Sequence, residues 1–210
     1  GVASRYDTAI PQVGMAVEAG IPEPRAWKLV QQVIGKDGDS SWDLRSLQIA
    51  EALGIPLMTV HSPADACLDE LVHKGISERQ PSTVGDLVDW IEGWPECQVL
   101  IDRARHGPTV DAGEARAPIG KVYQCLYGGW NPTSELFEEL CKAGVGTFVV
   151  VASSEAFREL AAKYCASIVV IPHYPGDNAG INIMLDRIMP QGDRFEIVEV
   201  GNYVRHRRAE

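Results

Sequence analysis

The pattern His-x-Pro-x-Asp occurs twice in the sequence, as His-Ser-Pro-Ala-Asp at residues 61–65 and as His-Tyr-Pro-Gly-Asp at residues 173–177. Pro and Asp each fill about one position in twenty of an average chain, so about one His in four hundred would carry this pattern by chance. The chain contains five His. Two occurrences among so few His argue against coincidence and indicate a shared chemical role.

Imidazole nitrogens and carboxylate oxygens are ligands for Zn, Mn and Fe. The two motifs supply His61, Asp65, His173 and Asp177, enough for one metal ion or for part of a two-metal site. We therefore predict that these side chains face one cleft, although 112 positions separate the motifs. In the other interpretation each Asp only caps a helix and the His is a polar neighbour. One motif alone fits either interpretation, whereas the repetition favours a shared site.

Each motif lies between a short apolar run and a helical pattern. The predicted strands Leu57–Val60 and Ile168–Ile171 precede the motifs, and the predicted helices Asp65–Gly75 and Asp177–Ile188 follow them. This order would place each His at the end of a strand and each Asp at the start of a helix. Because α/β sheets bind ligands outside the carboxyl ends of their strands, we expect a metal cleft there.

Helical and strand periods alternate along the chain, which predicts an α/β fold with a mostly parallel sheet flanked by helices. No linker or long repeat interrupts the pattern, so residues 1–210 are predicted to form a single domain. Further helices are predicted at Gln12–Ala19, Glu23–Ile34, Ser41–Leu53, Thr83–Ile91, Pro132–Ala143 (with Asn131 as N-cap) and Ser153–Tyr164. Further strands are predicted at Gln98–Ile101, Lys121–Tyr127, Thr147–Ala152 and Phe195–Val200. Gly128 and Gly129 fit a tight turn or a backbone cradle for an anion.

Composition excludes several classes of protein. With 19 Lys and Arg against 29 Asp and Glu, the net charge is −10, which argues against binding to duplex nucleic acid. No apolar run approaches the roughly 20 residues of a membrane helix. The five Cys are odd in number, widely spaced and never in a C-x-x-C pattern, so we expect free thiols in a reducing compartment, the cytoplasm. The G-x-S-x-G, P-loop and H-E-x-x-H patterns are absent. The sequence therefore gives no such support for a nucleophile hydrolase, a P-loop NTPase or a zincin.

Two stretches of the chain resemble the NIF-three-like family, often described as GTP cyclohydrolase 1 type 2 homologues. Residues 144–186, with Ile-Pro-His-Tyr-Pro-Gly-Asp-Asn-Ala-Gly-Ile-Asn at 171–182, resemble its C-terminal half. Residues 56–65, Pro-Leu-Met-Thr-Val-His-Ser-Pro-Ala-Asp, resemble its central motif. Many members carry an inserted domain in mid-chain. The stretch between Asp65 and Lys121 is too short to hold it, so the resemblance is to a compact form.

The resemblance implies an α/β fold with two divalent metal ions, Zn, Fe or Mn. Asp65 and His173 would each hold one ion, Asp177 would bridge both, and His61 would be a nearby ligand or catalytic proton carrier. The family also uses an adjacent His-His pair upstream, but no two His are adjacent here. Relative to the family the chain is therefore incomplete at its N-terminal end, or it has lost the pair.

The function implied by this resemblance is that of a dinuclear-metal-dependent hydrolase, of the GTP cyclohydrolase type, acting on a small nucleotide-like molecule. The alternative is a non-catalytic metal-binding protein with a regulatory or scaffold role, so the sequence leaves open whether the chain is an enzyme. The family's ring-like assemblies imply a homo-oligomer, with a hexamer as one form.

Overall fold

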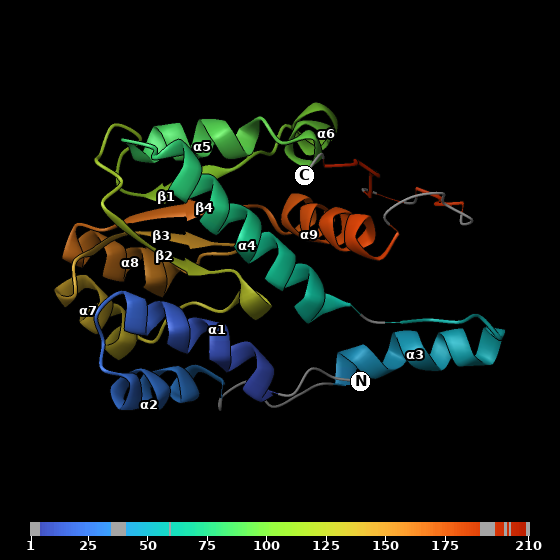
Figure 1. Ribbon diagram of the computed structural model, residues 1–210, viewed down its shortest axis with the longest axis horizontal. Coiled ribbons are helices and arrows are strands. Elements are labelled where there is room, and N and C mark those ends of the chain that lie inside the picture. Colours follow the sequence, from blue (N-terminus) through green and yellow to red (C-terminus); the bar gives the residue numbers. More distant parts are fainter. Residues whose placement is uncertain are drawn as a thin grey trace.

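A four-stranded sheet lies at the centre of the computed structural model (Figure 1), which describes residues 5–34, 41–58, 60–189, 196–199, 201 and 203–208. The strand order is β1-β4-β3-β2, with the bounds Thr109–Ala112, Ser167–Val170, Val145–Val150 and Lys121–Cys125. Strands β2, β3 and β4 are parallel, and β1 is antiparallel to β4. The predicted α/β fold with a mostly parallel sheet is confirmed.

Helices cover both faces of the sheet, because both faces of a parallel sheet are apolar. One face packs against α1, α2, α7 and α8, with the bounds Arg5–Glu18, Glu23–Ile34, Ser134–Lys142 and Glu155–Tyr164. The other packs against α4, α5, α6 and α9, with the bounds His61–Arg79, Val84–Glu92, Pro95–Ala104 and His173–Ile188. Side chains alternate along β3: Phe148 and Val150 join the first core and Val149 the second.

Two further elements, a short turn and a helix, complete the described fold. A short 3-10 turn, η1 (Tyr127–Gly129), follows β2. Helix α3 (Ser41–Leu53) precedes α4 and extends away from the sheet and its covering helices (Figure 1). Among the described elements, none makes more than slight contact with α3.

Local sequence signals located several helices correctly. The predicted helices Glu23–Ile34 and Ser41–Leu53 have these bounds in the structure. Thr83 caps α5 as predicted: its hydroxyl accepts the backbone N–H of Asp86 at 3.1 Å, and the Asp86 carboxylate accepts the backbone N–H of Thr83 at 2.8 Å. This reciprocal pair is a capping box, which satisfies two donors that the helix itself leaves open.

Three predicted strands are wrong. The stretch Gln98–Ile101 lies inside α6, where Pro95 opens the helix and the buried Cys97 and Leu100 lie one turn apart. Leu57, Met58 and Val60 are irregular, and Thr59 lies outside the described residues; no described strand pairs with this stretch. In the predicted strand Phe195–Val200, residues 196–199 are irregular and both ends lie outside the described part of the chain.

The predicted N-cap of α7 is also wrong. The helix begins at Ser134, and the hydroxyl of Thr133 accepts the Leu136 N–H. The Asn131 side chain instead links two backbone groups of the loop after β3, since it donates to the Ala152 carbonyl at 2.7 Å and accepts the Ser154 N–H at 3.0 Å. It joins two loops at the carboxyl edge of the sheet.

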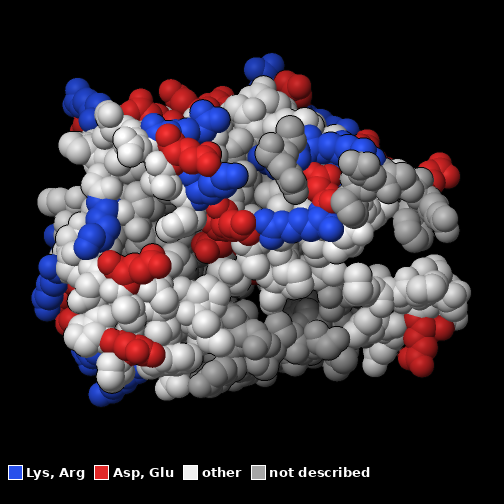
Figure 2. Space-filling model, viewed as in Figure 1, with Lys and Arg blue, Asp and Glu red and all other residues white. Residues whose placement is uncertain are grey.

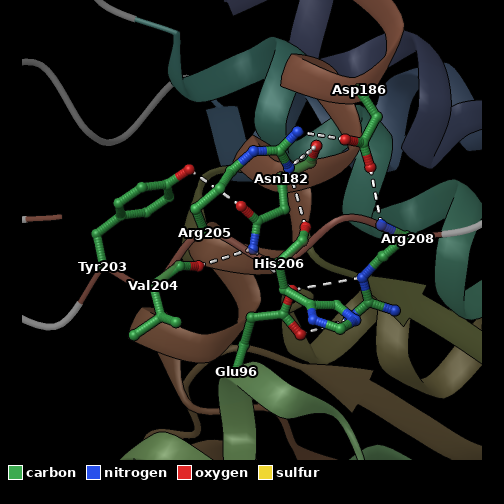
Figure 3. A network of polar contacts seen from close by, with 8 residues as sticks. All are labelled: Glu96, Asn182, Asp186, Tyr203, Val204, Arg205, His206 and Arg208. Carbon is green, nitrogen blue, oxygen red and sulfur yellow. Dashed lines mark hydrogen bonds and ion pairs between the residues drawn. The ribbon is translucent and has the colours of Figure 1, made fainter. Parts of the chain in front are cut away.

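Residues 203–208, which we call the C-terminal strap, bind to α6 and α9 through a polar network (Figure 3). Arg208 donates to the fully buried carboxylate of Glu96 at 2.6 Å, and Arg205 pairs with Asp186. Asn182, also fully buried, donates to Glu96 at 2.9 Å and hydrogen-bonds to the strap. The strap therefore joins two helices that are distant in the sequence.

Candidate functional site

Both His-x-Pro-x-Asp motifs form the beginning of a helix. Helix α4 starts at His61 and α9 starts at His173. The predicted order of strand, motif and helix is confirmed for the second motif, because α9 follows β4, and is wrong for the first, which no described strand precedes. In both motifs the Asp lies one turn inside its helix and does not cap it. A helix places residues i and i+4 on one face, so each motif presents its imidazole and carboxylate on the same side. In the first motif, His61 Nε2 lies 3.5 Å from Asp65 Oδ2.

The four side chains are close enough to influence one another electrostatically. Burial raises the pKa of the Asp65 carboxyl to about 6; the Gly128 N–H, His61 and His173 act in the opposite direction, and the Asp177 carboxylate raises the pKa further. Burial also raises the pKa of Asp177, against the effect of His173 and His61. The four groups, which come from two helices, therefore lie within electrostatic range of one another. That they face one cleft stays a prediction. Their roles as ligands stay predictions.

The carboxylates are recessed and the imidazoles lie outside them. Asp65 is 3% exposed, whereas the side chain of His61 is 67% exposed. His173 is exposed and Asp177 is half-buried. A molecule arriving from solvent therefore meets the imidazoles first, and the less exposed carboxylates provide negative charge beside them.

Gly128 contributes a backbone contact that the sequence did not reveal. It lies in η1 with φ +66°, a conformation open to Gly without strain, and its N–H donates to Asp65 Oδ2 at 3.0 Å. The two Gly had suggested a tight turn or an anion cradle; here the turn holds a carboxylate of the same chain. The Gly-Gly pair after a strand indicated a turn at this position. Its partner Asp65 could not be identified, because it lies 63 positions away in the sequence.

The four side chains are of types that bind divalent metal ions, since two are carboxylates and two are imidazoles. Burial raises the pKa of both carboxyl groups, and a cation beside them would favour their ionised form. In the part of the chain that the structure describes, no three His, Cys, Asp or Glu side chains are arranged to hold a metal ion. The residue types and their electrostatic proximity therefore fit a metal site, but the described side chains do not form a complete ligand shell.

The fold of the chain is similar to that of a known protein structure. No family model and no curated protein matches the sequence. The structure aligns with a NIF3 superfamily protein from Sphaerobacter thermophilus, with a TM-score of 0.67 over 89% of this chain and 70% of that chain, at 17% identity. The chain has the fold of a NIF3 superfamily protein. The resemblance to the NIF-three-like family is thus confirmed for the fold. None of the described helices of this NIF3 fold is long and apolar enough to cross a membrane.

A second carboxyl, that of the half-buried Asp69, lies one turn beyond Asp65 in the NIF3 fold. Burial raises the pKa of Asp69 to about 7, with further contributions from the carboxylates of Asp65 and Glu18. Its Oδ1 is buried and makes no hydrogen bond to any described group. An ionised Asp69 would therefore be poorly compensated, and its protonated form suits this position better.

We expect Asp69→Asn to remove a pH dependence of stability. The pKa of Asp69 is higher in the folded chain than its ordinary value of 3.8, so its contribution is fully present below pH 3.8 and is lost as the pH rises towards 7. At pH 8 the variant should be more stable than the wild type by about 2 kcal/mol, with little difference at pH 4. Urea unfolding at both pH values measures this; equal differences at the two values would contradict it.

Proposed function

We propose that the chain is a NIF-three-like, dinuclear-metal-dependent hydrolase acting on a small nucleotide-like molecule. The observation that supports this is the convergence of the two His-x-Pro-x-Asp motifs at the starts of α4 and α9. Asp65 and His173 would each hold one divalent ion, Zn, Fe or Mn, and Asp177 would bridge both. Cyclohydrolase chemistry on GTP is the specific activity that the family resemblance implies.

Bound ions would supply Lewis acidity towards an electrophilic carbon or phosphorus of the substrate and would activate water. The residues of the chain have their own tasks. The Gly128 N–H fixes one oxygen of Asp65, so the carboxylate is oriented before any ligand arrives. His61 is exposed with its Nε2 towards Asp65, which leaves Nδ1 to take a proton from water or return it to a leaving group. Asp65 holds that imidazole in place.

A combined metal-binding and turnover experiment tests this function. The purified chain is titrated with Zn²⁺, Mn²⁺ and Fe²⁺ by calorimetry and is then incubated with a panel of nucleotides that includes GTP. Metal-dependent product release supports the hydrolase. Tight metal binding without turnover across the panel supports the non-catalytic alternative, and no metal binding at all contradicts both.

A scaffold role has one observation of its own in its favour. Five aliphatic side chains in and after α3 are 47–74% exposed, and we call them the α3 patch: Ile49, Leu53, Ile55, Leu57 and Met58. Figure 2 shows few charged side chains over this part of the molecule. The patch offers on the order of 600 Å² per copy, so two copies would bury roughly 1,200 Å², the lower end for a specific interface. We therefore propose that a second copy of the chain covers it.

We expect the wild-type chain to self-associate and Leu53→Glu with Met58→Glu to abolish this. A charge placed in an apolar interface loses its hydration without gaining a partner. Light scattering should give a multiple of 22.9 kDa for the wild type and 22.9 kDa for the variant. Ile188→Glu, at an exposed Ile outside the patch, is the control. A monomeric wild type would contradict the proposal and leave another segment or protein as the occupant.

The cytoplasm is the compartment that we propose. All five Cys are free thiols, and three of them are buried. Free thiols persist where glutathione keeps proteins reduced. Over the face drawn in Figure 2, basic and acidic side chains are interspersed, which agrees with a small-molecule partner rather than a duplex nucleic acid.

A further inference from the structure

Helices α4 and α9 pack closely through small residues. Ala64, next to Asp65, and Gly180, three residues after Asp177, are both buried where the helices meet. A β-carbon built at Gly180 would lie 2.1 Å from the Ala64 carbonyl oxygen and 2.8 Å from its carbonyl carbon. These are backbone atoms in the interior of a helix, so they cannot turn aside as the end of a flexible side chain can.

We propose that Gly180 is a positioning residue of the candidate site, because its lack of a side chain sets the separation of α4 and α9 at which Asp65 and Asp177 can serve the same ions. The inference rests on the proposed function. Residues three apart share a helix face, so the contact of Gly180 with Ala64 lies beside the carboxylates that the two helices contribute. The contact is therefore well placed to fix their distance.

The size of the disturbance follows from the distances. Real β-carbons essentially never approach another heavy atom within 3.0 Å, so a methyl group at Gly180 must move the helices apart by about 1 Å, the scale of an ordinary van der Waals correction. Functional constellations tolerate about 0.5 Å of misplacement, and ions in two-metal sites lie roughly 3.5–4 Å apart. A displacement of this size would move Asp65 away from Asp177 without replacing any of the proposed ligand residues.

Gly176 provides a matched control on the same helix. Its added β-carbon would lie 3.1 Å from Leu68 Cδ2 and 3.6 Å from Ile171 Cγ2. The end of a Leu side chain can yield by a few tenths of an ångström, so Gly176→Ala should leave the helix separation almost unchanged. Gly14→Ala, in α1, adds a methyl group with nothing within 4 Å and controls for the substitution itself.

The test compares Mn²⁺ binding to the wild type, Gly180→Ala, Gly176→Ala and Gly14→Ala. We expect Gly180→Ala to bind Mn²⁺ about 100-fold more weakly and to lose the exchange-coupled electron paramagnetic resonance signal of an ion pair. Both Ala controls should keep the affinity within about threefold and retain the coupled signal. The spectrum is the decisive readout, because general destabilisation below the melting temperature would not uncouple two bound ions.

The outcomes separate this proposal from the proposed function. If the wild type binds no Mn²⁺, Zn²⁺ or Fe²⁺, the proposed function fails, and the crystal structure of Gly180→Ala still shows whether α4 and α9 have moved apart. If the wild type binds and Gly180→Ala binds equally with the same spectrum, the positioning role is wrong. A Gly180→Ala chain that does not fold, as judged by circular dichroism, would also overturn it, since Gly180 would then serve the fold as a whole.

Discussion

Replacing Arg208 with Ala is expected to lower the free energy of unfolding by about 3–5 kcal/mol, because it leaves a buried charge without its partner. Arg208 Nη2 lies 2.6 Å from Glu96 Oε2, and the Glu96 side chain is 0% exposed. The guanidinium also lies 5.3 Å from the centre of the Trp94 ring. Truncation removes both interactions, and only the Asn182 amide still donates to Glu96 among the described contacts.

Thermal and urea unfolding measure this effect, and the chain offers a matched control. Arg116 pairs with Glu114 at 2.7 Å, but their side chains are 86% and 65% exposed, so Arg116→Ala should cost no more than about 1 kcal/mol. The double variant Arg208→Ala with Glu96→Gln should recover part of the loss, because it removes the stranded charge. If Arg208→Ala and Arg116→Ala unfold alike, the Arg208–Glu96 pair does not anchor the strap to α6.

The buried pair could not have been predicted from the sequence. Arg208 lies in a run of basic residues at the end of the chain, which by composition is typical of a solvated tail, and Glu96 lies 112 positions away. Nothing local in either stretch identifies the other. The pair exists because the chain turns back after α9 and places the strap between α9 and α6 (Figure 3). Long-range contacts of this kind depend on the assembled fold.

Strand prediction failed where the hydrophobic pattern was ambiguous. The residues Gln-Val-Leu-Ile at 98–101 have a strand-like composition, but Pro95 begins a helix there and burial recurs at helical spacing through Cys97 and Leu100. At Leu57–Val60 the apolar run is real, yet a strand needs a neighbour to accept its hydrogen bonds, and no described strand provides one. The capping signal at Thr83 succeeded because the Thr83–Asp86 pair is complete within four residues, whereas the cap predicted at Asn131 was wrong.

The candidate site was partly predictable for the same reason. The residue types came from a repeated local motif, and the structure places the four groups within electrostatic range of one another. The His and Asp of each motif share the first turns of one helix, and only the second motif follows a described strand, β4. The sequence marked Gly128 as a turn but not its partner Asp65, and it did not mark Gly180 at all, because both glycines approach residues that are distant in the sequence.

Asp177→Asn is expected to weaken divalent metal binding by about 100-fold or more, because the proposed bridging ligand would lose its charge. The amide keeps the size of the carboxylate, so packing at the start of α9 should persist. Calorimetric titration with Zn²⁺ and Mn²⁺ measures the change. Asp102→Asn, at an exposed Asp of α6, is the control; Asp186 is unsuitable because its carboxylate pairs with Arg205 and accepts the Arg208 N–H.

Stability and metal affinity should move in opposite directions in this variant, which excludes unfolding as the cause of lost binding. Burial raises the pKa of Asp177 above its ordinary value, so ionisation of the group costs stability as the pH rises through that raised pKa. Asn carries no charge, and the metal-free variant should be at least as stable as the wild type at pH 8. The neighbouring Asp65 should also ionise more readily, because the Asp177 carboxylate raises its pKa. A variant that binds metal as tightly as the wild type would show that Asp177 is not a ligand, whereas weak binding in a fully folded chain assigns the loss to the site itself.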